Sequence, residues 1–166
     1  LYLRVLDGRT AGASLSEMTP EFWDRTLSIN LRGTFLTVKA CADSLRTSGG
    51  GSVVIITSTA GQRGSAVYSA YATSKGAQIL FMRSMAKELA PDRIRVNCVA
   101  PGWTETDMSR DAMTAFGREE IIASMPLGRI GEPDDPANAA VFLLSDMASF
   151  ITGSTITVDG GSDMRG

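Results

Sequence analysis

Histidine is absent from this chain of 166 residues, and cysteine occurs only at positions 41 and 98. Without histidine the chain cannot form a Ser-His-Asp triad, a Cys-His nucleophile or a zinc site of mixed Cys and His ligands. Two isolated cysteines are most simply buried, reduced thiols, so we expect Cys41 and Cys98 to lie in the core. These absences exclude several classes of enzyme and favour an intracellular protein.

The chain also lacks a large excess of one charge and has no long apolar run. The chain has 18 acidic and 16 basic residues, a net charge of -2, and its arginines are scattered. Nucleic acid or anionic lipid would need a basic patch. No uncharged run approaches the roughly 18 residues of a membrane span, and residues 1–10 lack the basic start and apolar stretch of a signal peptide. We therefore expect a cytoplasmic protein without nucleic-acid or membrane partners.

What the chain does contain is the composition of a globular domain, with 43% hydrophobic and 20% charged residues. Together with the length, this composition predicts a single domain over residues 1–166. The first residue is Leu1 instead of methionine, and residues 1–13 are poorly patterned beside the rest of the chain. We expect the start of the domain to be truncated.

Strands and helices are predicted to alternate along the chain. Thr19-Pro20-Glu21 has the residues of a helix start, and apolar positions at helical or strand spacing define the later elements. The predicted helices are at about 20–46, 69–89 and 135–145. The predicted strands, at 52–57, 94–99 and 154–158, are short apolar runs typical of buried parallel strands. This alternation predicts an α/β fold, a parallel sheet with helices on both faces.

The segment 103–132 is predicted to be irregular, apart from a short helix at about 119–125. It is rich in Met, Gly and Thr, and it is too long for an ordinary connection between a strand and a helix. We expect it to be a lid over a substrate site. The acidic residues Glu132, Asp134 and Asp135 lie near a predicted helix start. Interaction with the helix dipole is therefore a better interpretation of these residues than a metal site.

Tyr71 and Lys75 are the residues with the clearest predicted chemistry. They are four positions apart in one predicted helix, so they lie on one face, one turn apart. A tyrosine titrates at about pH 10, and a neighbouring ammonium favours the phenolate, so Tyr71 could transfer a proton nearer to neutral pH. Reduction of a carbonyl needs such a proton at the oxygen. The structural alternative is an exposed helical pair.

Two further polar residues are candidates for the same site. Ser58 follows the strand at 52–57, at the sheet edge where open α/β folds bind ligands, and its hydroxyl could hold a substrate oxygen. Asn30 interrupts the apolar face of the first helix and could anchor a buried water or backbone group near Lys75. An ordinary turn serine and a structural amide are the alternatives.

In their order and intervals, Asn30, Ser58, Tyr71 and Lys75 resemble the active-site tetrad of the classical short-chain dehydrogenase/reductase family. Residues 95–106, RVNCVAPGWTET, are similar to the family's strand that ends in Asn-x-(hydrophobic)-x-Pro-Gly-x-x-x-Thr. Ile151-Thr152-Gly153 and Val158-Asp159-Gly160-Gly161 are similar to its C-terminal signature. The similarity covers residues 15 to 163, and implies the C-terminal two-thirds of a Rossmann-like domain.

The resemblance implies an NAD- or NADP-dependent oxidoreductase that interconverts a secondary alcohol and a ketone by hydride transfer. It makes Tyr71 the acid/base. Lys75 would lower the pKa of Tyr71 and hold the nicotinamide ribose, Ser58 would orient the substrate oxygen, and Asn30 would position a proton-relay water. A small-molecule alcohol or ketone is the implied substrate.

The Pro101-Gly102 backbone and the Thr106 hydroxyl, by the same resemblance, would contact the nicotinamide end of the cofactor, and the loop at 103–125 would close over substrate. Ending a strand and capping a helix are the structural alternatives for these residues. Helices at 20–46 and 70–89 usually form subunit contacts in the family. This implies a homo-oligomer, often a tetramer.

The chain also departs from the family pattern. The Gly-rich Thr-Gly-x-x-x-Gly-x-Gly turn, which cradles the cofactor pyrophosphate at a helix N-terminus, is missing, and Ala11-Gly12 is all that is left of the Asn-Asn-Ala-Gly strand end. A truncated, non-catalytic fragment or subunit-interaction module is therefore the alternative function. A third possibility is a protein that keeps the fold without redox chemistry. Relatives of that kind carry arginine where this chain has Lys75, so the lysine argues against this possibility.

Overall fold

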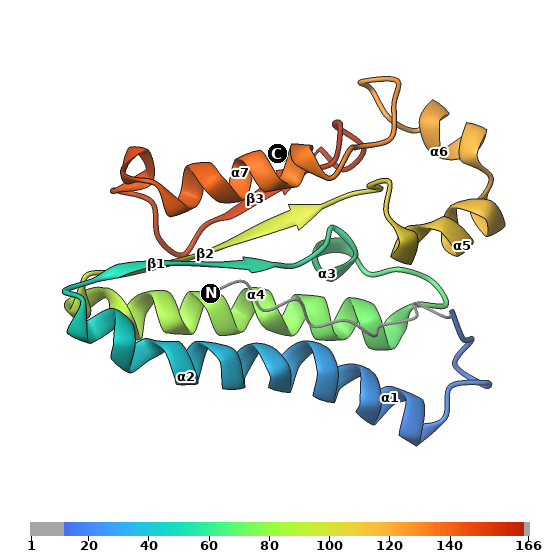
Figure 1. Cartoon of the computed structure of the whole chain (residues 1–166). Helices are drawn as coiled ribbons and strands as arrows, with labels where there is room; N and C mark the ends of the chain where they lie inside the picture. The colour runs from blue at the N-terminus through green and yellow to red at the C-terminus, as the bar shows by residue number, and fades with distance from the viewer. Residues whose placement is uncertain (1–11, 165–166) are drawn as a thin grey trace.

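The computed structural model describes residues 12–164, so the poorly patterned residues 1–11 lie outside the described part. Its centre is a parallel sheet of three strands in the order β1-β2-β3. The strands are β1 (Gly51–Ile56), β2 (Ile94–Pro101) and β3 (Thr155–Val158). Val54 of β1 pairs with Asn97 of β2, and Cys98 of β2 pairs with Thr155 of β3. All carboxyl ends therefore lie at one end of the sheet (Figure 1).

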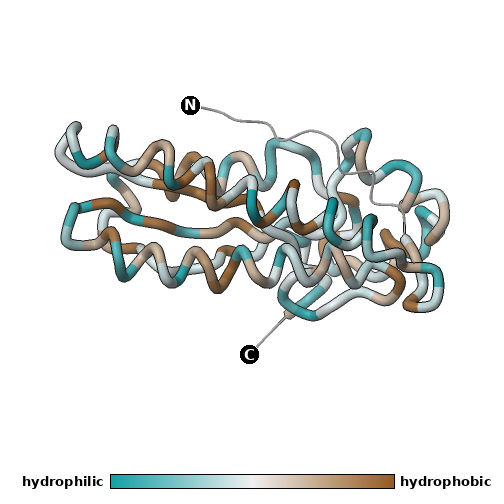
Figure 2. The backbone as a smooth tube through the Cα atoms, turned by 90° about the horizontal axis from the view of Figure 1, so that it is seen from below, coloured by the Kyte–Doolittle hydropathy of each residue, from teal (hydrophilic) through white to brown (hydrophobic). Residues whose placement is uncertain are grey.

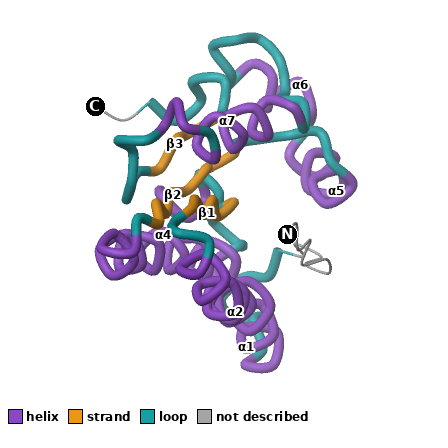
Figure 3. The backbone as a smooth tube through the Cα atoms, turned by 60° about the vertical axis from the view of Figure 1, so that its left-hand side comes forward, coloured by secondary structure: helices purple, strands orange, loops and turns teal. Residues whose placement is uncertain are grey.

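Helices cover both faces of this sheet, as the sequence predicted (Figures 1 and 3). One face is covered by α4 (Ser69–Leu89) and by the helical run α1 (Pro20–Leu27), the π-helix η1 (Ser28–Arg32) and α2 (Gly33–Thr47). The other is covered by α7 (Asp134–Leu144). Beyond the carboxyl ends of the strands lie α3 (Ala60–Arg63), α5 (Asp107–Phe116) and α6 (Arg118–Ala123). Short 3-10 turns occur at Ala90–Asp92 and Asp146–Ala148.

The core lies where α4 and α7 meet the sheet. Met82 of α4 and Val96 of β2 are fully buried in the cluster on the α4 face. Leu143 of α7 packs with Val99 of β2 on the opposite face. These apolar stretches run along the strands and the adjoining helices in Figure 2. Burial of such side chains is the main stabilisation of the fold. Both cysteines are free thiols; Cys98 is buried, whereas Cys41 is half-buried.

The first predicted helix is confirmed, but it contains a π-turn that the sequence did not reveal. Thr19 caps its start, since its hydroxyl accepts the N–H of Phe22 at 3.2 Å. At Ser28–Arg32 the helix widens to π geometry before it continues as α2. Such single-turn insertions are frequent at functional sites.

Arg95 is the charged residue of β2, and its hydrogen bonds connect β2 to α7. Its guanidinium donates to the carbonyls of Leu143 at 2.8 Å and Ser145 at 3.1 Å, and to the Ile151 carbonyl at 3.3 Å. A cation at a helix C-terminus satisfies carbonyls that have no partner within the helix and complements the dipole. The charge in β2 thus holds the second helical layer on the sheet.

The segment at 103–132 is more ordered than predicted, because it contains α5 as well as α6. Thr106 and Ser109 form a capping box at the start of α5. The sequence signal was weak because Ser109 stands where the usual box has Glu or Gln. Met113, Ile121, Met125 and Ile130 form an apolar cluster of this segment's own. Among residues 12–164, none of the helices has the length and apolar content that a membrane crossing requires.

Candidate active site

The structure brings Ser58, Tyr71 and Lys75 together at the carboxyl end of β1. Ser58 follows β1, and Tyr71 lies in the first turn of α4 with Lys75 one turn later. The side chains of Ser58 and Tyr71 are hydrogen-bonded. The Ser58 Oγ also accepts the N–H of Ala60 at 3.1 Å, and Lys75 Nζ lies 5.7 Å from the centroid of the Tyr71 ring. A hydroxyl, a phenol and an ammonium thus share one site.

A close backbone contact sets the distance between these side chains. A Cβ built on Gly61 of α3 would lie 2.6 Å from the backbone nitrogen of Gly76 and 2.6 Å from the carbonyl carbon of Lys75. In turn, a Cβ on Gly76 would lie 2.9 Å from the Gly61 oxygen. Only glycine permits this approach. The segment that carries Ser58 can therefore pack directly on the helix that carries Tyr71 and Lys75.

Lys75 is an ammonium held in a largely buried place. Its Nζ donates to the carbonyl of Ile56, the last residue of β1, at 2.9 Å. Burial lowers the pKa of Lys75 to about 8, and the charge interaction with Cys98 opposes this shift. The side chain is thus charged at neutral pH but releases its proton more readily than an exposed lysine does.

The pKa of Tyr71 moves in the direction opposite to the one expected from the sequence. Burial raises the pKa of the phenol, and the hydrogen bond with Ser58 lowers it by less. Burial outweighs the neighbouring ammonium because Lys75 is turned to the Ile56 carbonyl and is itself desolvated. Tyr71 is therefore a neutral phenol at physiological pH, which is the state of a proton donor.

We expect the buried ammonium to make stability depend on pH. The pKa of Lys75 in the folded chain, about 8, is below its ordinary value of 10.5, so between these values the unfolded chain binds more protons and the free energy of unfolding rises with pH. Cys98 acts oppositely above pH 9.0, because burial raises its pKa from that value to about 12. Because Lys75→Met keeps Cys98, the contribution of Cys98 largely cancels, and relative to this variant the wild-type chain should gain stability between about pH 8 and 10.5.

Urea unfolding at several pH values across this window measures the effect, since the midpoint at constant m reports stability. The quantity compared is the slope of the free energy of unfolding against pH. Any loss of stability that the substitution itself causes is the same at each pH and therefore cancels. Parallel slopes in the wild type and in Lys75→Met would show that the ammonium of Lys75 is not desolvated in the folded chain.

Asn30 lies in the π-helix η1 and is connected to α4 by hydrogen bonds. Its Nδ2 donates to Ser74 Oγ at 2.9 Å, and Ser74 Oγ donates to the Tyr71 carbonyl at 2.7 Å. Its backbone carbonyl accepts from Gln78 Nε2 at 3.0 Å and from Thr34 Oγ1 at 2.7 Å. Asn30 is thus connected to α4 through Ser74 and Gln78. Sequence reasoning missed these two residues, although both are polar and three or seven positions from Tyr71, on one side of a mostly apolar helix.

The predicted nicotinamide-side residues lie at the end of β2, next to the Ser58 segment. The carbonyl of Pro101 accepts the N–H of Thr59 at 3.0 Å, and the N–H of Gly102 donates to the Val158 carbonyl at 2.9 Å. A Cβ on Gly102 would lie 2.6 Å from the Cβ of Asp159. Strand ending is therefore one role of the Pro-Gly pair, and their contact with a cofactor stays a prediction.

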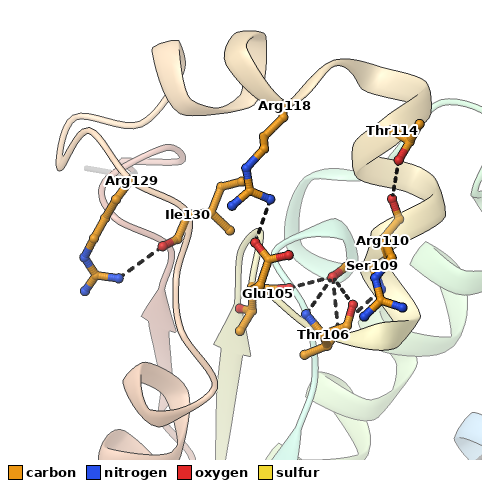
Figure 4. Close-up of polar contacts among 9 residues, drawn as sticks. Glu105, Thr106, Ser109, Arg110, Thr114, Arg118, Arg129 and Ile130 are labelled. Carbon is orange, nitrogen blue, oxygen red and sulfur yellow. Dashed lines mark hydrogen bonds and ion pairs between the residues drawn. The ribbon is translucent and has the colours of Figure 1, made fainter.

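Thr106 caps α5, which was the structural alternative for this residue. Its Oγ1 accepts the N–H of Ser109 at 3.3 Å, and the Ser109 hydroxyl lies 3.0 Å from it (Figure 4). The side chain is exposed at the lid. Its predicted contact with the nicotinamide end would have to be made in addition to the cap.

An ion pair and contacts between aromatic rings fasten the segment at 103–132. Arg118 of α6 lies 2.7 Å from Glu105, in a contact without hydrogen-bond geometry (Figure 4). Phe116, at the end of α5, stacks on Tyr68 with centroids 6.1 Å apart and meets Trp103 edge-on at 5.5 Å. Tyr68 comes directly before α4 and Trp103 follows β2. The end of α5 therefore contacts the residue that precedes α4, the helix of Tyr71.

The acidic residues at the start of α7 complement the dipole of that helix. Asp134 and Asp135 lie in its first turn, and both carboxyl oxygens of Asp135 accept from Arg129, at 2.7 and 2.9 Å. The hydrogen bond from Arg129 lowers the pKa of Asp135 to about 2. In the described part of the chain no group of His, Cys, Asp or Glu side chains is arranged to hold a metal ion.

Two hollows on the surface lie away from these residues. One, of about 230 Å³, is lined by Arg46, Gly49 and Asp92 at the amino ends of the strands. Another, of about 80 Å³, lies within the lid between Glu105 and Met113. Ligands of open α/β sheets bind beyond the carboxyl ends of the strands, so neither hollow marks the chemistry as well as the Ser58, Tyr71 and Lys75 cluster does.

Comparison with known proteins gives the relatives of this chain. The family described as enoyl-(acyl carrier protein) reductase matches residues 7–163. The dehydrogenase/reductase SDR family member 4 of Pongo abelii is 42% identical over 153 residues, which are 92% of this chain and 55% of that protein. The (3R)-3-hydroxyacyl-CoA dehydrogenase of Rattus norvegicus is 39% identical over 155 residues, 93% of this chain and 60% of that protein. The chain spans somewhat more than half of the length of these curated relatives.

A solved structure gives the same result for the fold. The gluconate 5-dehydrogenase from Burkholderia cenocepacia J2315, in complex with NADP and tartrate, superposes with a TM-score of 0.87 at 31% sequence identity. The match covers 92% of this chain and 60% of that one. The likeness confirms the Rossmann-like α/β architecture that the order of strands and helices predicts.

Proposed function

This chain belongs to the short-chain dehydrogenase/reductase family, and from that membership we propose that it carries the catalytic residues of an NAD- or NADP-dependent oxidoreductase that interconverts a secondary alcohol and a ketone. The observation that carries the proposal is the hydrogen bond between Ser58 and Tyr71 with Lys75 one helical turn away. A relative named as a 3-hydroxyacyl-CoA dehydrogenase supports the alcohol and ketone as substrate class.

The donors at this site fit the ribose end of a nicotinamide nucleotide. An ammonium has three N–H donors, and the contact to Ile56 uses one of those of Lys75. The Tyr71 hydroxyl, one turn away, is a second donor. Lys75 and Tyr71 would hold the ribose hydroxyls, with Pro101 and Gly102 near the nicotinamide. When bound, the cofactor supplies or accepts the hydride.

The chain's own residues move the proton. In reduction, Tyr71 Oη gives its proton to the ketone oxygen, and its raised pKa ensures that the proton is present at neutral pH. Ser58 Oγ donates a hydrogen bond to the same substrate oxygen, and the Lys75 ammonium stabilises the phenolate that remains. In oxidation, the phenolate takes the alcohol proton, which requires a higher pH. The neutral phenol therefore favours reduction under physiological conditions.

A second candidate function is a non-catalytic fragment or subunit-interaction module. Its support is the exposure of apolar side chains on the two long helices α2 and α4. Phe35 and Leu36 of α2 and Leu80 of α4 are 44%, 48% and 64% exposed. Exposed apolar side chains on these helices support the homo-oligomer that the family resemblance implies.

We expect the purified chain to bind NADH or NADPH saturably and the Lys75→Ala variant to lose this binding, because the ammonium is the main cationic donor at the site. Nicotinamide fluorescence follows the titration, and circular dichroism confirms that both proteins are folded. If the folded wild-type chain binds neither nucleotide, the oxidoreductase proposal is wrong for this chain and the non-catalytic alternative is favoured.

A further inference from the structure

Gln62 of α3 and Thr157 of β3 are 95 positions apart in the sequence, and hydrogen bonds join their side chains. Gln62 Nε2 donates to Thr157 Oγ1 at 3.2 Å, and Thr157 Oγ1 donates to Gln62 Oε1 at 3.3 Å. Both side chains are half-buried, so water competes with these bonds less than it does at the surface. Because a hydroxyl both accepts and donates, the two contacts are kept in either orientation of the amide.

This pair of side chains connects the segment after the first strand to the third strand. Gln62 lies in α3, which follows β1, and Thr157 pairs with Ala100 of β2. Since β2 lies between β1 and β3 in the sheet, the connection crosses the carboxyl end of β2, beyond which α3 lies (Figure 1). The N–H of Thr59 donates to the carbonyl of Pro101 at 3.0 Å and ties the same segment to β2. The segment that carries Ser58 is thus attached to each of the three strands.

The helix α3 is a single turn that depends on contacts with the rest of the fold. It has four residues, and the side chain of its N-cap residue, Thr59, makes no cap. Helices shorter than about 12–15 residues are marginal in water on their own. One attachment of α3 is the close packing of Gly61 on α4. The bonds from Gln62 to Thr157 are a second attachment, at β3, and with both in place α3 cannot tilt on α4.

The Ser58 hydroxyl is bonded to the start of this turn. Its Oγ accepts the N–H of Ala60 at 3.1 Å, and its carbonyl accepts the N–H of Gly61 at 3.0 Å. The same hydroxyl is hydrogen-bonded to Tyr71. A hydroxyl has one hydrogen to donate, and with the Ala60 N–H on its oxygen that hydrogen is directed to the phenol. A tilt of α3 would therefore turn the Ser58 hydroxyl away from Tyr71.

We propose that Gln62 is a positioning residue for Ser58: its hydrogen bonds to Thr157 hold α3 in the place where the Ser58 hydroxyl faces Tyr71. The contacts run from Thr157 through Gln62 to the backbone of α3, and from the N–H of Ala60 to Ser58 Oγ. Gln62 acts through Ser58 and is assigned no contact with substrate. The inference rests on the proposed function, in which Ser58 holds the substrate oxygen beside Tyr71, and it adds β3 to the elements that set the geometry of the site.

The test is the ionisation midpoint of Tyr71, because the hydrogen bond from Ser58 lowers the pKa of this phenol. Fluorine NMR follows the titration on the whole chain with difluorotyrosine in place of tyrosine. The fluorines withdraw electron density from the ring, so the phenol ionises at a lower pH and the fold is kept. The tyrosines are Tyr2, Tyr68 and Tyr71, and Tyr2→Phe and Tyr68→Phe assign the signals. Lys75, the titratable group that faces the Tyr71 ring, is unchanged in every variant.

Ser58→Ala removes the hydrogen bond to the phenol, so the midpoint of Tyr71 should rise, and its value gives the upper limit. Gln62→Met keeps the shape of the side chain without the amide, and Thr157→Val keeps the shape without the hydroxyl. Each should raise the midpoint of Tyr71 toward the Ser58→Ala value. The double variant should show no further rise, because both substitutions break the same connection.

The sign of the shift distinguishes positioning from packing. If Gln62 only fills space, its loss admits water, and since burial raises the pKa of Tyr71, the midpoint then falls or stays at the wild-type value. An unchanged or lower midpoint in the folded Gln62→Met and Thr157→Val variants overturns the proposal, and so does a rise in one of them alone. Thr157→Val decides by itself if Gln62→Met does not fold. A wild-type midpoint in Ser58→Ala also overturns the proposal, because there is then no hydrogen bond to position.

Thr155→Val is the matched control. Thr155 lies two residues before Thr157, on the same face of β3, and its hydroxyl interacts with the thiol of Cys98 on β2. The substitution makes the same chemical change as Thr157→Val but leaves the bonds of Gln62 in place, so the midpoint of Tyr71 should stay unchanged. The titration needs neither cofactor nor substrate. Failure of nucleotide binding would therefore contradict the proposed function alone, and normal binding with unchanged Tyr71 midpoints would contradict only the role of Gln62.

Discussion

Tyr71→Phe is expected to lower ketone reduction by about 10²–10⁴-fold, the usual contribution of a general acid. The substitution removes the phenol that gives its proton to the ketone oxygen, and it leaves Ser58 without the hydrogen bond to its side chain. Loss of NADPH absorbance with a panel of ketones and 3-oxo thioesters measures the rate. The binding of NADPH should weaken less than in Lys75→Ala, because the Lys75 ammonium remains.

Tyr68→Phe is the control for this variant, since Tyr68 lies three residues earlier and stacks on Phe116. It should keep most of the activity. The rate of reduction by the wild type should fall as the pH rises through the pKa of Lys75, about 8, where the ammonium is lost, and fall further above the raised pKa of Tyr71. A Tyr71→Phe variant that keeps more than about a tenth of the wild-type rate would contradict the acid/base role.

Gly61→Ala is expected to destabilise the fold by about 1–3 kcal/mol, as overpacking of a tight contact does. The new methyl would lie 2.6 Å from backbone atoms of both Lys75 and Gly76, and backbone cannot swing aside as a long side chain can. To relieve the clash, α3 must move away from α4, which separates Ser58 from Tyr71. Both the urea midpoint and the rate of ketone reduction should fall.

Gly33→Ala is the matched substitution, at the start of α2. Gly33 has helical angles, φ −58° and ψ −44°, and the nearest atom to a Cβ placed there is the Ser28 oxygen at 3.9 Å. Alanine in a helix is better than glycine by about 0.5–1 kcal/mol, so this variant should be slightly more stable. Equal effects of the two substitutions would contradict the importance of the contact at Gly61.

The strands and the α4 helix could be predicted closely because their signals are local. The run of β-branched residues from Val53 to Ile56 can be buried only as a strand between helical layers. The end of α4 at Leu89 is set by Pro91, which cannot continue a helix. Tyr71 and Lys75 lie on one face for the same local reason, the period of the helix.

The remaining features depend on partners that are distant in the sequence. Gln78 and Ser74 are ordinary polar residues until Asn30, more than 40 positions earlier, comes into contact with them. The raised pKa of Tyr71 results from burial in the tertiary structure. The sequence shows only the nearby Lys75, and this ammonium alone predicts a lowered pKa. The π-turn likewise has no local code, because each of its residues is also compatible with an α-helix.

That π-turn divides the first helix into two pieces with different neighbours. Before and within Ser28–Arg32 the helix contacts α4, and after it α2 contacts β1. One extra residue in a turn advances the direction of every later side chain by about 100°, the angle of one residue in a helix of 3.6 per turn. A helical wheel with one fixed period therefore mixes the two faces. In an alignment of relatives, a one-residue gap within Ser28–Arg32 would mark a change in the element on which the helix packs. A gap of the same length within α2 would instead disrupt the packing of α2 on β1.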